Sequence, residues 1–210
     1  MSLLEAQHSF YRERVPAQFN QTLSHQIELA SKDEAALRML EEMRAVRTAI
    51  RVEVESDSGL RIHQLEIEGG KMRAVEVAAR SPFFILRHRL DQFPNLRREC
   101  DTSILGFLGV MAGLETEMKL TSQRVRSLRA LKGSLRFEIE GPDGFGLVAS
   151  FGVDPPEPQP RAGIRLSSEI FEALRSGMLD AQVAFLDERI EVVGDLELAI
   201  GVALAAASPD

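Results

Sequence analysis

Residues 163–206, GIRLSSEIFEALRSGMLDAQVAFLDERIEVVGDLELAIGVALAA, decide the fold of this chain. Ile164 and Leu166 alternate as at the end of a β-strand. A short helix follows, because Ser167 or Ser168 can cap its N-terminus and Gly177 can end it. The apolar stripe of this helix consists of Ile170, Phe171 and Leu174.

The second part of this stretch predicts a returning strand and a closing helix. Gln182-Val183-Ala184-Phe185 precedes an alternating strand that contains Ile190 and Val192. Asp195 is placed to cap the last helix, which is almost wholly apolar. A helix that is apolar all round is more hydrophobic than a terminal surface helix needs to be.

In order and spacing, this stretch resembles the sterol carrier protein type 2 family. That family has a short helix ending in Gly, a Q-x-A-F-like segment, an I-x-(I/V)-x-G-(D/N) strand and a Leu/Ala-rich last helix. Near the N-terminus, Val15-Pro-Ala-Gln-Phe-Asn20 is similar to the (L/V)-P-x-x-F-N opening of the family. The resemblance implies a non-enzymatic lipid-binding domain that holds an apolar ligand between a curved sheet and the last helix. One departure is Asp187–Gly194, which carries acids where family members often have lysines.

The resemblance also indicates which side chains would contact a lipid. Any one of them could equally be ordinary core packing, because most apolar helical stripes are core. Gln182 is the uncharged polar group of the motif, and it would bond either a ligand head or the local backbone. The expected lipid-binding residues are Phe171, Leu174, Met178, Gln182, Phe185, Leu196, Ile200 and Leu204.

The chain reads as two similar halves. Ala49–Glu55 and Ser134–Glu140 each alternate as a strand, and a turn ending in Gly leads each into a second strand. Helical stripes precede both strands: Leu40, Met43 and Val46 in the first half, and Val125, Leu128 and Leu131 in the second. Downstream in the first half, 74–79 predicts a third strand, and Ser81-Pro82 predicts the start of a helix.

We therefore predict an α+β fold, with a mostly antiparallel twisted sheet covered by helices, arising from an internal tandem duplication. Residues 1–114 form a degenerate sterol-carrier-like half, and residues 115–210 form the lipid-binding domain. The tail of the first half has no recognisable returning strand, so that half has either a closed core or a different pocket. Ile104–Leu114 could be a helix, although three glycines weaken it.

Composition excludes several classes of protein. The chain is 44% hydrophobic and 27% charged, as in globular proteins, and its net charge of −7 gives no overall attraction to nucleic acid. Residues 80–98 are a local basic exception, which is either a solvated helix face or a dock for the acidic C-terminal third or an anionic membrane surface. Cys100 is a lone cysteine, and the four histidines have no metal-binding spacing. We see no acid/base pair, so we expect no enzyme activity, no metal and no cofactor.

The longest apolar run is too short to span a bilayer, so we expect at most peripheral membrane contact. The N-terminus does not read as a signal peptide, and a reducing, cytoplasmic location is expected. The oligomeric state stays open.

Two functions remain. The first is binding, and possible transfer, of a hydrophobic ligand (sterol, fatty acid, acyl-CoA or isoprenoid lipid) in an apolar cavity of the C-terminal half. The second is a non-enzymatic scaffold with a filled core and no ligand. If the last helix walls a pocket, Ile200→Asp should abolish uptake and also destabilise the chain, because a buried unpaired carboxylate is costly.

Overall fold

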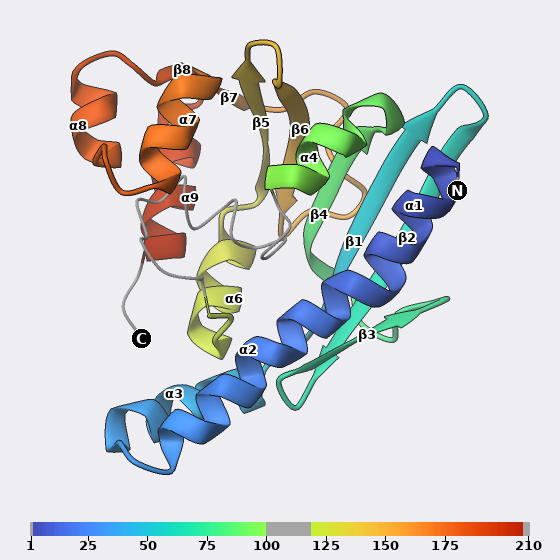
Figure 1. Ribbon diagram of the computed structural model, residues 1–210, viewed down its shortest axis with the longest axis vertical. Coiled ribbons are helices and arrows are strands. Elements are labelled where there is room, and N and C mark those ends of the chain that lie inside the picture. The colour runs from blue at the N-terminus through green and yellow to red at the C-terminus, as the bar shows by residue number, and fades with distance from the viewer. Residues whose placement is uncertain (1, 100–118, 208–210) are drawn as a thin grey trace.

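The computed structural model describes residues 2–99 and 119–207 (Figure 1). The predictions made for Cys100, for Ile104–Leu114 and for a boundary between residues 114 and 115 lie outside these residues. Within them, no helix is both long and apolar enough to cross a membrane.

The chain begins with a long helix made of α1 (Leu3–Ser9), a π-helical turn (Phe10–Arg14) and α2 (Val15–Ala30). Ser2 starts it, because its hydroxyl accepts from the Glu5 amide while the Glu5 carboxylate accepts from the Ser2 amide. Asn20 fastens it to the sheet edge by bonding both the N–H and the C=O of Met72. α3 (Glu34–Ala45) then packs against α2.

The first half of the sheet contains β1 (Arg47–Ser56), β2 (Gly59–Glu68), β3 (Lys71–Val75) and β4 (Pro82–Arg89). The prediction of a helix after Ser81 was wrong, since Pro82 opens β4. The segment forms a strand because it pairs with β1 on one side and with β6 on the other. Pro at the first position of a strand removes no ladder bond from its interior. The third strand also ends earlier than predicted, and Val77 beyond it is 80% exposed.

A 3₁₀ turn (Leu90–Gln92) and α4 (Phe93–Glu99) follow β4. The second half begins with α6 (Ser122–Ala130), β5 (Gly133–Glu140), β6 (Phe145–Phe151) and β7 (Ala162–Ser167). It ends with α7 (Ser168–Arg175), α8 (Ala181–Leu186), β8 (Glu191–Gly194) and α9 (Leu196–Ala207).

All these strands form one eight-stranded sheet in the order β3-β2-β1-β4-β6-β5-β7-β8. The β1–β4 and β5–β7 pairs are parallel, and the other pairs in the described residues are antiparallel. The predicted α+β class and mostly antiparallel sheet are thus confirmed, with the sheet mixed rather than purely antiparallel.

The two halves repeat one strand arrangement within that sheet. In β1, Val52 lies between His63 of antiparallel β2 and Leu86 of parallel β4. In β5, Phe137 lies between Leu147 of antiparallel β6 and Ile164 of parallel β7. β4 thus takes the place in the first half that β7 takes in the second, and an antiparallel β4–β6 pair joins the halves. Duplication as the origin of this arrangement stays a prediction.

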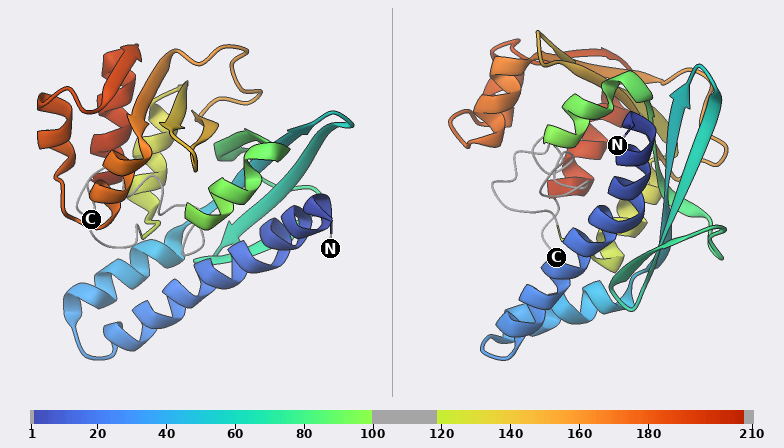
Figure 2. Two further views of the ribbon diagram at one scale, coloured as in Figure 1. Left: turned by 45° about the horizontal axis from the view of Figure 1, so that its top comes forward. Right: turned by 45° about the vertical axis from the view of Figure 1, so that its right-hand side comes forward.

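The helices gather on one face of the curved sheet (Figure 2). The long N-terminal helix crosses β1 to β3, while α7, α8 and α9 lie over the other end (Figure 1). Side chains between sheet and helices form one continuous apolar core that includes Val52, Leu86 and Phe137. On the opposite face, Glu53 is buried beneath Arg51 and Arg87, which both pair with it. One apolar and one polar face are typical of an antiparallel sheet covered on one side.

Candidate functional site

Two helices of the C-terminal half, α7 and α9, start at the caps that the sequence predicted, and α7 ends before the predicted Gly177. The Ser167 hydroxyl caps α7 by accepting from the Ile170 amide, and Gly177 follows the helix with φ of +70°. Asp195 caps α9 by accepting from the Leu198 amide at 2.9 Å. This bond and the ion pair with Arg161 hold the pKa of the Asp195 carboxyl below its ordinary value. The Gln182–Phe185 segment lies in α8, which Asp180 caps.

Two of the eight predicted lipid-binding residues lie in the core. Phe171 and Leu174 on α7 are 3% and 7% exposed. The ring of Phe171 packs edge-to-face on Phe145 of β6, with 6.0 Å between the ring centroids. These residues hold α7 on the sheet, and Phe171 also reaches the groove described below.

The other six lie at the surface. Met178 follows α7, and Gln182 and Phe185 lie on α8; all three are exposed. Leu196, Ile200 and Leu204 are 46%, 43% and 66% exposed, and they recur every four residues along one side of α9. The opposite side of α9, with Leu198 and Val202, packs into the core. α9 therefore has apolar side chains both in the core and in solvent.

α9 approaches α6 closely at Gly201. A Cβ at this position would lie 2.9 Å from a terminal methyl of Leu131, which directly follows α6. The missing side chain thus lets the two helices touch. With α9 in this position, Leu198 and Val202 lie in the core, and the Leu196-Ile200-Leu204 stripe is exposed.

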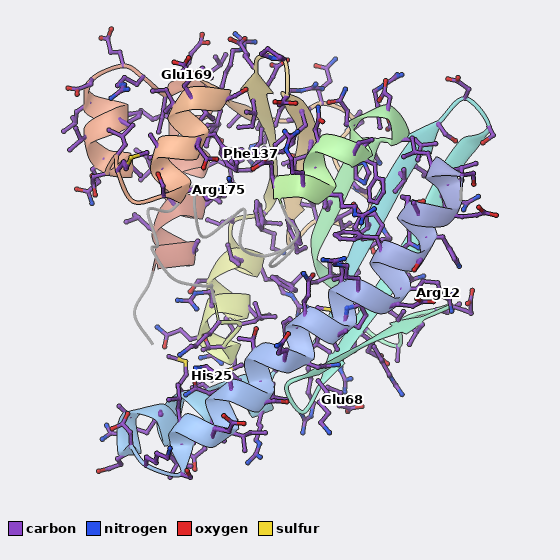
Figure 3. The ribbon with its side chains drawn as sticks, in the orientation of Figure 1. Arg12, His25, Glu68, Phe137, Glu169 and Arg175 are labelled. Atoms are coloured by element: carbon purple, nitrogen blue, oxygen red, sulfur yellow. The ribbon has the colours of Figure 1, made fainter. Side chains whose placement is uncertain are left out.

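A groove of about 510 Å³ lies between the end of α4, the β5–β6 turn and α7. Its apolar floor is formed by Ile139, Phe145 and Phe171, and its rim is charged. Of the eight predicted residues, Phe171 alone lines it. In Figure 3, Glu169 and Arg175, both of which line the groove, mark the two ends of α7.

The rim of this groove joins the two halves of the chain. Glu99, at the end of α4, pairs with Arg98 and with Arg175 of α7. Arg98 also pairs with Asp143 in the β5–β6 turn at 3.0 Å. Sequence spacing could not reveal this rim, because its residues come from separate parts of the chain.

A second polar cluster lies under the N-terminal helix. The Gln7 amide nitrogen is 2.6 Å from Nε2 of His63, and the Tyr11 hydroxyl is 2.7 Å from Nε2 of His88. Burial lowers the pKa of both histidines to about 4. Although His8, His63 and His88 are far apart in sequence, the fold brings them together. Residues 2–99 and 119–207 nevertheless contain no group of three or more His, Cys, Asp or Glu side chains that could hold a metal ion.

The chain is an α+β protein with helices on one face of its sheet and an apolar closing helix, and its C-terminal half matches a known family. Residues 115–204 match the SCP-2 sterol transfer family. The resemblance found in residues 163–206 is therefore confirmed for the C-terminal half. No curated protein matches the chain.

Several solved structures share partial likeness with the chain, among them the following three. Sterol Carrier Protein 2 from Yarrowia lipolytica (apo form) is 20% identical, with a TM-score of 0.33, over 52% of this chain and 94% of its own. Sterol Carrier Protein 2 Like 2 from Aedes aegypti is 18% identical, with a TM-score of 0.32, over 50% and 95%. The MycE methyltransferase of mycinamycin biosynthesis is 14% identical, with a TM-score of 0.26, over 94% and 45%.

Proposed function

We propose that the protein binds a hydrophobic ligand through its C-terminal half, without catalysing a reaction and without a cofactor. The observation that carries the proposal is the exposed apolar stripe Leu196-Ile200-Leu204 on α9, inside the segment that matches the SCP-2 sterol transfer family. Exposed apolar side chains that line up in this way are typical of a binding surface.

The ligand class is lipid: a sterol, fatty acid, acyl-CoA or isoprenoid. The neighbouring α8 supports this proposal, because Val183 and Phe185 on it are 47% and 39% exposed. Leu, Ile and Phe side chains suit a flexible aliphatic guest, which needs apolar contact more than hydrogen bonds. The cytoplasm remains the proposed location.

One observation favours the second candidate, a scaffold without a ligand. The inner face of the C-terminal strands is well covered, since Phe137, Ile164 and Leu166 are 1%, 9% and 3% exposed. In that case the α9 stripe would contact a partner protein rather than a lipid.

The two candidates differ in what the purified protein carries and takes up. Native mass spectrometry would detect a co-purifying lipid, and fluorescence would follow uptake of a labelled fatty acid or sterol. Binding predicts that Ile200→Gln and Leu204→Gln each lower uptake several-fold, because each removes an apolar side chain whose burial against the lipid is worth about 1 kcal/mol or more. Both side chains are exposed, so both variants should fold.

Leu37→Gln is the matched control, because Leu37 is an apolar residue on α3 with 42% exposure. It should leave uptake unchanged. A protein that is repeatedly isolated empty and takes up neither probe is a scaffold, and the binding proposal then fails.

A further inference from the structure

A cavity of about 210 Å³ lies at the β2–β3 edge of the sheet, beside the N-terminal helix and far in sequence from the proposed lipid site. His8 and Arg12 reach it from one side of the helix, and Arg61 and His63 from one face of β2. Figure 3 shows Arg12 on the helix beside β3. Two elements thus direct four basic side chains into one small space.

The cavity has little negative charge to balance them. Glu76, just after β3, is the one acid that lines it, and it pairs with Arg12. The Glu76 side chain is 81% exposed, so water can replace this pair at small cost. Arg61 has no hydrogen bond or ion pair with any residue in 2–99 or 119–207.

The lowered pKa of His63 reflects both its burial and the positive charges around it. Its ring is 5% exposed, and burial, followed by the charges of His8, Arg61 and Arg12, lowers its pKa to about 4. The charge of His88 on β4 also lowers the pKa of His63. On the β3 side of the ring, the Glu76 carboxylate interacts with His63. Basic groups held together in this way gain stability when an anion enters.

The neighbour of His63 has spare hydrogen-bonding capacity. The Gln7 amide nitrogen bonds His63 Nε2, while the Gln7 amide oxygen is buried with no hydrogen-bond partner in the described residues. A neutral His63 accepts from the amide nitrogen, and a protonated His63 would donate to the oxygen after a flip of the amide. Gln7 can therefore hydrogen-bond to His63 in both the neutral and the protonated state of the ring.

We infer that this cavity binds a phosphate group, held by Arg12, Arg61 and His63. Guanidinium groups bind phosphate oxygens through paired N–H donors, which favours phosphate over a halide ion. A volume of 210 Å³ equals that of about seven water molecules in the liquid. The space suits a phosphate with a few attached atoms and is too small for a lipid chain.

Titration of the full chain with inorganic phosphate, followed by calorimetry and by the NMR signals of the histidine rings, tests this site. Chloride at equal ionic strength is the reference. Phosphate should bind, and it should raise the pKa of His63, because an anion favours the charged ring. Absence of both effects overturns the site.

Three variants test whether phosphate binds in this cavity. Arg61→Gln removes an exposed side chain and should weaken phosphate binding about tenfold, as expected for the removal of a charged hydrogen bond. Glu76→Gln removes the competing carboxylate and should tighten binding about threefold. Arg38→Gln on α3, where Arg38 is 73% exposed, is the control that should change nothing. Equal binding by wild type and Arg61→Gln overturns the assignment.

The phosphate could be a free ion or a lipid headgroup, and vesicles distinguish these sources. Phosphatidylcholine vesicles with and without phosphatidic acid would be compared for wild type and Arg61→Gln. Binding that needs both phosphatidic acid and Arg61 identifies a headgroup, and binding of inorganic phosphate alone identifies a free ion. Loss of lipid uptake by the α9 variants would leave both results unchanged, so this inference stands or falls separately from the proposed function.

Discussion

The buried hydroxyl of Tyr11 donates a hydrogen bond to Nε2 of His88, over 2.7 Å. The direction follows from the other ring nitrogen, because Nδ1 lies 2.8 Å from the carbonyl oxygen of Arg89, which can only accept. Because burial lowers the pKa of His88 to about 4, the ring is neutral at neutral pH, and its single proton on Nδ1 leaves Nε2 to accept from Tyr11. This bond joins the π-helical turn of the N-terminal helix to β4, in the middle of the sheet.

Tyr11→Phe should lower the free energy of unfolding by about 2 kcal/mol, because it leaves Nε2 of His88 buried without that donor. Urea denaturation at neutral pH measures the change. A decrease below about 0.5 kcal/mol would mean that water replaces the hydroxyl.

The stability of the protein should fall as the pH drops from about 6.5 towards 4. Burial lowers the pKa of His63 and His88 from 6.5 to about 4, so the unfolded chain takes up protons in this range while the folded chain does not. Each histidine should cost about 2 kcal/mol between pH 7 and pH 5.

Urea denaturation at the two pH values checks this. His63→Gln should remove about half of the dependence, because it removes one of the two buried rings. An unchanged free energy of unfolding between the two pH values would contradict the burial of both rings.

Gly152→Ala should destabilise the protein by about 3 kcal/mol or more. Gly152 has φ of +63°, and a Cβ there would lie 1.9 Å from the backbone oxygen of Arg129, so the end of α6 would have to move. Gly69 has nearly the same φ, +60°, with open space around it. Gly69→Ala should cost only about 1 kcal/mol, and equal melting temperatures of the two variants would refute the contact with Arg129.

Ile200→Asp and Leu198→Asp should differ sharply. Leu198 is 4% exposed, and a carboxylate there should cost several kcal/mol, about 4 or more. Ile200 is 43% exposed, so Ile200→Asp should cost only about 1 kcal/mol, in contrast to the large destabilisation expected from the sequence. Thermal melting compares the two, and similarly large decreases in melting temperature would show that the outer stripe of α9 is covered.

Local sequence signals predicted the C-terminal half well, because each depends on a few neighbouring residues. Ser167 and Asp195 cap their helices, and Gly177 ends one, through bonds within a few positions. Ser81-Pro82 failed for the opposite reason. The local signal favoured a helix start, but two neighbouring strands, distant in sequence, pair with this segment and make it a strand.

The candidate site was predictable only in part. Periodicity identified the apolar residues of α9, but it could not tell that Leu196, Ile200 and Leu204 face solvent, because the whole helix is apolar. The groove between α4 and α7 brings together residues from both halves, and no spacing within either half indicates it. The convergence of His8 and His63 has the same cause.

The antiparallel pair of β4 and β6, which is the seam between the two halves, affects how the chain folds. Phe84–Arg87 pair with Val148–Phe151 across this seam, so neither half closes its own sheet. Produced alone, each half would present an unpaired strand edge, ready to recruit a second molecule. Folding is therefore expected to be a single all-or-none event in which β6, a strand of the second half, completes the sheet of the first half as well as its own.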